Sequence, residues 1–333
     1  MLTRIFLLSA ILAGPAVADV PRVATDILPV HGLVSRVMAG IGEPVLVVPP
    51  NASPHGYAMR PSEARALEQA DLIVWVGPDL TPWLEDAVAT LAADAKSLRL
   101  LAVAGTHLLS FGGDHADAHG DGHTVEEDHA EYAGHDHDGE AHADQIHSGG
   151  DEDHADEHDH AGGTDPHAWL DPDNGALWLG ALAEALAELD PENAGTYRAN
   201  AAAGQAEIAV ATTEAESLIA PAKDRAFLTF HDAYGYFEER FDVPSSGSVR
   251  LGDATSPGAA SLAALRDRVV TDGIVCLFSE PQFDPGLAGA VIEDSDAEIS
   301  VLDPIGLSVA PGPDFYPNFI KGLAVDMTGC LTR

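Results

Sequence analysis

Short apolar runs alternate with amphipathic segments along two stretches of the chain. In the first stretch, the apolar runs predict strands at 20–25, 44–50, 71–77 and 98–105, with helices between them. The second stretch repeats this alternation, with strands predicted at 226–230, 273–278 and 298–304. Uninterrupted apolar strands are typical of parallel sheets covered by helices on both faces. The pattern therefore predicts an α/β fold of two (β/α) lobes, each built on a small doubly wound sheet.

A long helical pattern lies between the two stretches. Residues 191–219 are rich in Ala and Glu and contain no Pro after the first position. A helix of about 30 residues spans about 45 Å, enough to serve as a rigid link. We therefore expect an N-terminal lobe at 19–190, a linking helix at 191–219 and a C-terminal lobe at 220–333, in which the Gly- and Ser-rich segment 245–258 is predicted to be a turn.

The first 18 residues have the pattern of a cleavable secretory signal. Arg4 precedes an apolar run at 5–13, and a small-residue triplet ends at Ala18. That run is too short for a permanent span, no Cys follows to accept a lipid, and no later apolar run reaches 18 residues. We therefore expect an exported protein with no membrane anchor.

The chain is strongly acidic, with a formal net charge of −38. Residues 107–166 account for −18 of this, so the rest of the chain is acidic too. This balance disfavours nucleic acid and anionic membrane surfaces as partners, and it favours a cationic ligand.

Histidines are concentrated in one low-complexity stretch. Thirteen of the 16 histidines lie between His107 and His167, together with 18 Asp or Glu and no Lys or Arg. Gly, Ala and Asp separate the imidazoles, so residues 107–166 lack the apolar side chains needed for a core and are predicted to be disordered. We interpret them as a loop that collects transition-metal ions, because imidazole binds zinc, nickel and copper. A solvated acidic linker is the alternative.

Two cysteines, Cys276 and Cys330, are present in a chain expected to reach an oxidising compartment. A disulfide is the first expectation there. The alternative is a pair of metal ligands.

Three histidines lie at predicted strand ends or at the end of the low-complexity stretch. His55 follows the strand 44–50, His167 comes where the regular pattern resumes, and His231 follows the strand 226–230. Ligands of doubly wound sheets bind beyond the carboxyl ends of the strands, so these histidines are candidate metal ligands. Asp303 and Glu280 are candidates for a fourth donor, although an acid before Pro often only caps a turn.

Five ordered motifs resemble the zinc-specific periplasmic solute-binding proteins of ABC transporters, the ZnuA type. They are SPHGYAMRPSEARALEQADLIVWVGPDLTPWLEDA, DPHAWLDPDN, FHDAYGYF, FSEPQF and LDPIG, arranged around a histidine-rich insert. The likeness covers essentially the whole chain after the signal. It implies two (β/α) lobes joined by a long helix, with Zn²⁺ bound in the interlobe cleft. It also implies that the metal is delivered to a membrane permease driven by a cytoplasmic ATPase.

The resemblance also implies a ligand set. By motif, the ligands are His55, His167 and His231, with Asp303 or water in the fourth place. The disulfide between Cys276 and Cys330 agrees with the family as well. Manganese relatives have Glu at the position of His231, so a histidine there favours zinc. Some zinc members have Glu where this chain has Pro54, which removes one possible donor.

The sequence thus predicts a monomeric periplasmic zinc receptor and no enzyme. A manganese or broader divalent-metal receptor is one alternative, and a periplasmic zinc buffer or metallochaperone is another. A secreted zinc hydrolase is a third, with Glu280 as its general base, although no catalytic zinc signature such as HExxH occurs.

Overall fold

The computed structural model describes residues 20–111, 163–250 and 258–333. Residues 20–109 and 164–333 belong to one compact unit, and residues 110–163 fall outside it. The predicted signal and most of the histidine-rich stretch lie outside the described residues.

The N-terminal lobe contains a parallel sheet in the order β2-β1-β3-β4. Its described strands are β1 (Val23–Thr25), β2 (Val45–Leu46), β3 (Leu72–Trp75) and β4 (Lys96–Arg99). The helices that connect or follow them are α1 (Leu28–Val37), α2 (Pro61–Glu68), α3 (Pro82–Leu91) and the 3₁₀ turn η1 (Leu100–Ala102). Each α-helix has Pro in its first turn, where the missing N–H costs no hydrogen bond.

The C-terminal lobe has the same topology, in the order β6-β5-β7-β8, again with parallel pairing. Its described strands are β5 (Phe227–His231), β6 (Ser248–Arg250), β7 (Cys276–Ser279) and β8 (Glu298–Val301). The helices of this lobe are α6 (Gly235–Phe241), α7 (Ala259–Thr271), α8 (Pro285–Ile292) and α9 (Phe315–Leu331), with the 3₁₀ turn η3 (Ala220–Ala222) just before β5. Two lobes with doubly wound parallel sheets confirm the predicted fold class.

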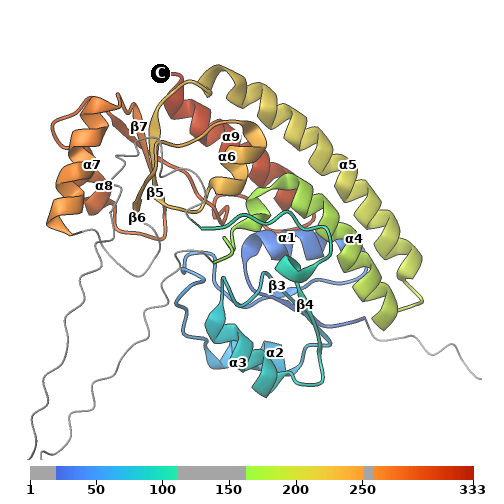
Figure 1. Ribbon diagram of the computed structural model, residues 1–333. Coiled ribbons are helices and arrows are strands. Elements are labelled where there is room, and N and C mark those ends of the chain that lie inside the picture. The colour runs from blue at the N-terminus through green and yellow to red at the C-terminus, as the bar shows by residue number, and fades with distance from the viewer. Residues whose placement is uncertain (1–19, 112–162, 251–257) are drawn as a thin grey trace, which may run out of the picture. The chain divides into compact units, whose positions relative to one another are not determined.

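Helices α4 (Pro172–Leu189) and α5 (Ala194–Ile219) connect the lobes. The 26-residue α5 packs along α4 and α9, and α1 of the first lobe packs against all three (Figure 1). Buried apolar residues of both lobes and of these helices form one continuous core cluster. Burial of apolar surface is the main stabilising contribution to a fold. Because this cluster is continuous, the lobes are joined by a packed apolar interface as well as by a helix.

Two local predictions were wrong. Residues 248–250 form strand β6 inside the segment predicted to be a turn, because parallel pairing of Ser248 with Thr229 stabilises a run that lacks a continuous apolar pattern. Strand β4 ends at Arg99, before most of its predicted range, and the chain then turns into η1. No described helix meets the length and hydropathy that a membrane span requires.

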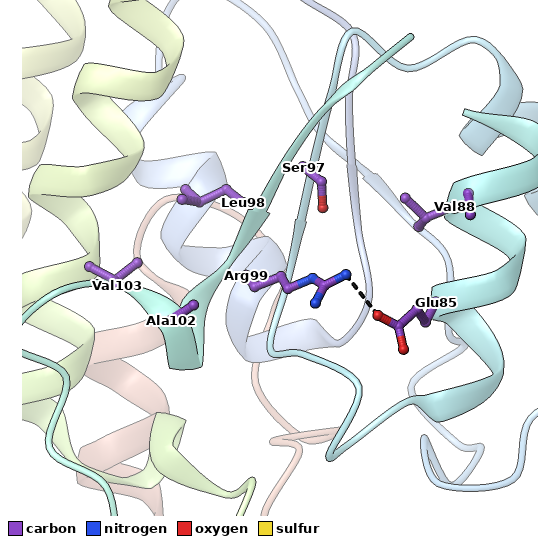
Figure 2. Close-up of a pocket in the computed structure, with 8 residues that line it drawn as sticks. Glu85, Val88, Ser97, Leu98, Arg99, Ala102 and Val103 are labelled. Atoms are coloured by element: carbon purple, nitrogen blue, oxygen red, sulfur yellow. Dashed lines mark hydrogen bonds and ion pairs between the residues drawn. The ribbon is translucent and has the colours of Figure 1, made fainter. Parts of the chain in front are cut away.

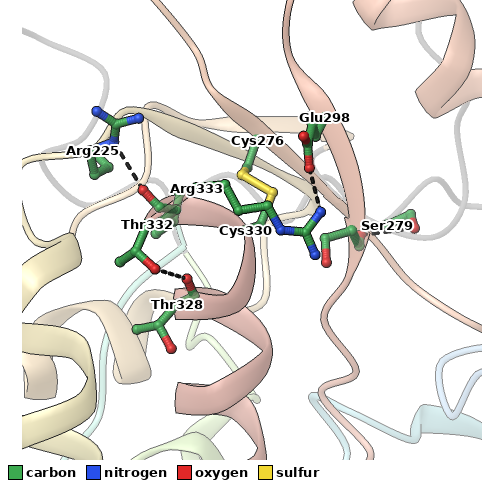
Figure 3. The surroundings of a disulfide bond; sticks show 10 residues. Arg225, Cys276, Ser279, Glu298, Thr328, Cys330, Thr332 and Arg333 are labelled. Carbon is green, nitrogen blue, oxygen red and sulfur yellow. Dashed lines mark hydrogen bonds and ion pairs between the residues drawn. A yellow bond between two sulfur atoms is a disulfide. The ribbon is translucent and has the colours of Figure 1, made fainter.

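A disulfide bond joins Cys276 of β7 to Cys330 of α9 (Figure 3). Both residues are buried, and they lie 54 positions apart. Arg333 also pairs with Glu298 of β8 at 2.6 Å, beside the disulfide. The end of α9 is therefore fixed to the strands that carry part of the site described below.

Candidate metal centre

Three histidines from distant parts of the sequence converge in the described structure. One ring nitrogen from each of His55, His167 and His231 lies within 4.8 Å of the others, and no other described group of three His, Cys, Asp or Glu meets this criterion. The ring centroids are 5.3 Å apart for His167 and His231, 5.5 Å for His55 and His167, and 6.4 Å for His55 and His231. The three side chains thus surround one point, as ligands of a single ion do.

His231 is the last residue of β5, and its partner follows the neighbouring strand β7. Glu280 Oε1 lies 2.6 Å from His231 Nδ1, and both side chains are buried. Because a carboxylate only accepts hydrogen bonds, this contact places the proton on Nδ1 and leaves Nε2 with a lone pair. His231 Nε2 lies 3.4 Å from His167 Nε2, inside the histidine cluster.

His167 has an equivalent partner from its own segment. Asp165 Oδ1 accepts the backbone N–H of His167 at 3.0 Å and lies 2.7 Å from its Nδ1. Burial raises the pKa of the Asp165 carboxyl to about 7, against the opposing effect of the His167 backbone hydrogen bond. Two of the three histidines therefore have a carboxylate on the nitrogen that faces away from the cluster, as zinc-ligating histidines commonly do.

The segment after His167 is held by the C-terminal lobe. Trp169 of η2 (Ala168–Leu170) donates its indole N–H to Pro304 O at 2.8 Å, and the Tyr316 hydroxyl donates to Trp169 O at 2.7 Å. A Cβ on Gly175 would lie 2.4 Å from the Tyr316 ring, so glycine is required for this close approach. These contacts hold the segment that carries His167 against the C-terminal lobe, whose strand β5 carries His231.

His55 comes from the loop after β2 and is less buried than the other two. This loop is attached to the first lobe, because Trp83 Nε1 donates to Pro54 O at 2.8 Å. The Tyr57 hydroxyl donates to Glu63 at 2.9 Å, and the rings of Tyr57 and Trp83 are 5.9 Å apart. The first lobe thus provides one histidine of the cluster, on a loop supported by α2 and α3.

The three histidines line a cavity of about 20 Å³. This volume suits a water-sized occupant and is far too small for a sugar or a peptide. Its lining comes from both lobes and consists of Ser53, Pro54, His55, His167, Trp169, His231, Glu280, Gln282, Phe283, Pro304 and Ile305. The geometry therefore points to a single small ion.

Asp303 lies close to this cavity but outside the three-histidine group. Its Oδ1 accepts from the backbone N–H of Ile305 and from Gln282 Nε2, both at 3.0 Å, and its Oδ2 accepts from Leu307 N at 2.5 Å. To bind a metal, this carboxylate would have to share or lose these hydrogen bonds. Its role as the fourth ligand stays a prediction.

Two further residues of this region were not identified from the sequence. Asp165 could have been found, because an Asp two positions before a candidate ligand and ahead of Pro can bond that ligand's amide and ring. Gln282 lies within the motif FSEPQF, but that motif does not show that its side chain reaches the cavity, since this depends on the turn after β7.

A larger hollow of about 470 Å³ lies beside α3 and β4 (Figure 2). Its charged lining residues, Arg99 and Glu85, pair with each other at 2.8 Å, and Arg99 also lies over the Trp75 ring. The lining contains no histidine. Size alone therefore does not mark the metal centre.

The family model described as "Zinc-uptake complex component A periplasmic" (ZnuA) matches residues 23–329. The chain belongs to this family. It is 44% identical to the high-affinity zinc uptake system protein ZnuA of Paracoccus denitrificans over 96% of this chain and 94% of that one. It is 39% identical to the ZnuA protein of Brucella suis over 100% of this chain and 99% of that one. A crystal structure of ZnuA has a TM-score of 0.70 at 22% identity, covering 94% of this chain and 99% of that chain, which shows the shared fold.

Proposed function

We propose that this protein is a high-affinity periplasmic zinc receptor that captures Zn²⁺ and delivers it to the permease of a zinc-uptake ABC transporter. The observation that carries the proposal is the convergence of His55, His167 and His231 on one small cavity. Family membership and the names of the relatives support it.

The donor set suits zinc better than manganese. Three imidazoles form a nitrogen-rich site of low coordination number, whereas manganese prefers more oxygen ligands in octahedral geometry. The apolar wall of Trp169, Phe283 and Ile305 also leaves little room for extra waters in the cavity. Zinc is therefore the cargo that we propose.

Delivery of an ion requires no chemical step in this protein. A hydrolase would need a base beside the metal-bound water, and the carboxylate suggested for that role, Glu280, instead accepts from His231 Nδ1. This contact favours a function for Glu280 in orienting a ligand.

The test is a zinc competition titration against a chelator of known affinity, using the mature chain with and without residues 112–163. We expect deletion to remove weak sites and leave one tight site. His55→Ala, His167→Ala and His231→Ala should each abolish that tight site. Loss of tight binding on deletion alone would instead support a zinc buffer, in which the histidine-rich stretch holds the metal.

The same titration between pH 5 and 7.5 provides a second check. Imidazole must be neutral to bind metal, so affinity should fall as the pH drops through about 6.5, the usual imidazole pKa. An affinity that is constant over this range would contradict ligation by histidine.

A further inference from the structure

Leu109 and Asp165 form a backbone pair where the compact unit of the chain is interrupted by residues 110–163. Asp165 N donates to Leu109 O at 2.9 Å, as in a pair of antiparallel strands. Asp165 is also the residue whose carboxylate contacts His167 Nδ1. The base of the histidine-rich stretch and the metal centre therefore share one short segment.

The hydroxyl of Tyr236, from α6, completes this pair. In an antiparallel pair of this kind, each residue donates its N–H to the carbonyl of the other. Between Leu109 and Asp165 one bond is direct, and the second passes through the hydroxyl, which accepts from Leu109 N at 2.9 Å and donates to Asp165 O at 2.8 Å. Tyr236 is buried, and burial raises the pKa of its hydroxyl above the ordinary value, so it keeps the proton that it donates.

The other side of the pair is held by α4. Asn174 Oδ1 accepts from His107 N at 2.8 Å, and Asn174 Nδ2 donates to His107 O at 3.0 Å. The rings of His107 and Tyr236 also lie 5.9 Å apart, edge to face. Leu109 is thus anchored two residues away by α4, and Tyr236 connects it to Asp165 from α6.

The hydroxyl acts as a spacer of fixed length between two backbone groups. Without it, Leu109 N and Asp165 O would lose their hydrogen-bond partner, which costs free energy where water is excluded. They could recover a bond only by moving toward each other. That movement would shift the Asp165 main chain from its place beside His167.

We propose, on the basis of the zinc-receptor function above, that Tyr236 is a positioning residue of the metal centre. Its hydroxyl sets the Leu109–Asp165 pair, and this pair holds the Asp165 carboxylate against His167 Nδ1. The orientation of one ligand imidazole therefore depends on a side chain that does not touch that imidazole.

The test is a double-mutant cycle on zinc affinity, measured by competition titration. Tyr236→Phe should lower the affinity by about 3- to 10-fold, less than the 10- to 100-fold typical when an outer carboxylate itself is removed, as in Asp165→Ala. In the Asp165→Ala background, Tyr236→Phe should add less than about twofold, because its effect passes through the carboxylate.

Tyr197→Phe is the matched control. Tyr197 is buried like Tyr236, and its hydroxyl donates to Asp190 at 2.9 Å, between the ends of α4 and α5. Both Phe variants keep the buried ring and lose one hydroxyl, so they should be similarly destabilised. Zinc affinity should fall in Tyr236→Phe and stay unchanged in Tyr197→Phe.

A spectroscopic measurement separates positioning from general stability. In zinc-loaded protein labelled with ¹⁵N-histidine, the Nδ1–H proton of His167 should exchange faster with water in Tyr236→Phe than in Tyr197→Phe. The chain without residues 112–163 simplifies this spectrum. It joins Leu109 to Asp165 through three residues, a length that hairpins use, so the effect of Tyr236→Phe on affinity should persist there.

Three results would overturn the inference and leave the proposed function intact. They are a Tyr236→Phe variant that binds zinc like the control, losses that multiply in the double variant, and an effect that disappears with residues 112–163. If His167→Ala instead keeps the tight zinc site, the receptor function itself fails.

Discussion

The two lobes have the same sheet topology but use the same position in the sheet differently. In each lobe the first strand lies between the next two, which creates a point where the helical connections diverge and ligands commonly bind. In the C-terminal lobe this point holds the pair of His231, at the end of β5, and Glu280, just after β7. In the N-terminal lobe it holds Asp26, just after β1.

The Asp26 side chain forms its hydrogen bonds with the backbone of its own lobe. Its carboxylate accepts from Ile27 N at 2.7 Å and from Val76 N, just after β3, at 2.8 Å. The residue is fully buried, and burial raises the pKa of its carboxyl to about 7. Both lobes therefore offer the same position in the sheet. The side chain at the strand end decides whether that position contributes to the histidine cluster, as His231 does, or is closed by backbone hydrogen bonds, as at Asp26.

The largest expected effect is a difference in zinc affinity between variants of His231 and of Asp26. His231→Ala removes a ligand and should lower zinc affinity by more than about 100-fold, beyond the loss typical of an outer carboxylate. Asp26→Asn should leave zinc affinity within about threefold, because the Asp26 carboxylate bonds backbone groups of its own lobe, Ile27 N and Val76 N. Competition titrations on both variants measure this, and equal losses would remove the distinction.

A smaller effect on zinc affinity is expected from Glu280, whose carboxylate contacts His231 Nδ1. Glu280→Ala should weaken zinc binding by about 10- to 100-fold, because His231 loses the acceptor that sets its tautomer and ring orientation. Glu280→Gln should recover much of that loss, since an amide oxygen still accepts from Nδ1–H. Glu293→Gln, at an exposed pair with Arg266, is the control. If both Glu280 variants behaved like this control, Glu280 would have no orienting role.

The smallest effect concerns stability in the N-terminal lobe. The pKa of Asp26 rises from 3.8 to about 7 on folding, so the folded state binds the proton more tightly. The stabilisation from this group is fully present below pH 3.8 and is lost as the pH rises to about 7. The unfolding free energy of the natural protein minus that of Asp26→Asn should therefore decrease over this window.

Urea unfolding of zinc-free protein at three pH values checks this, because groups common to both proteins cancel in the difference. A difference that stays constant with pH would show that Asp26 is ionised in the folded protein throughout.

Local patterns were sufficient for much of the fold. The sequence pattern was enough to predict strong apolar runs, such as the one containing β3, and helices that begin with Pro, such as α3. In both cases the signal lies within a few neighbouring residues. Strand β6 was missed because its only reason to be a strand is its pairing with β5. The three histidines were found because each occurs at a recognisable change of pattern or within a family motif.

The sequence by itself determined the α/β class, the acidic character and the residue types able to bind a transition metal. Tertiary structure decided which of these residues meet, since His55, His167 and His231 are separated by more than 60 positions from one another. It also decided that Glu280 contacts His231 and that Gln282 lines the same cavity. The physical reason is that apolar periodicity acts over short distances in the chain, whereas a metal centre depends on distances between atoms from different elements.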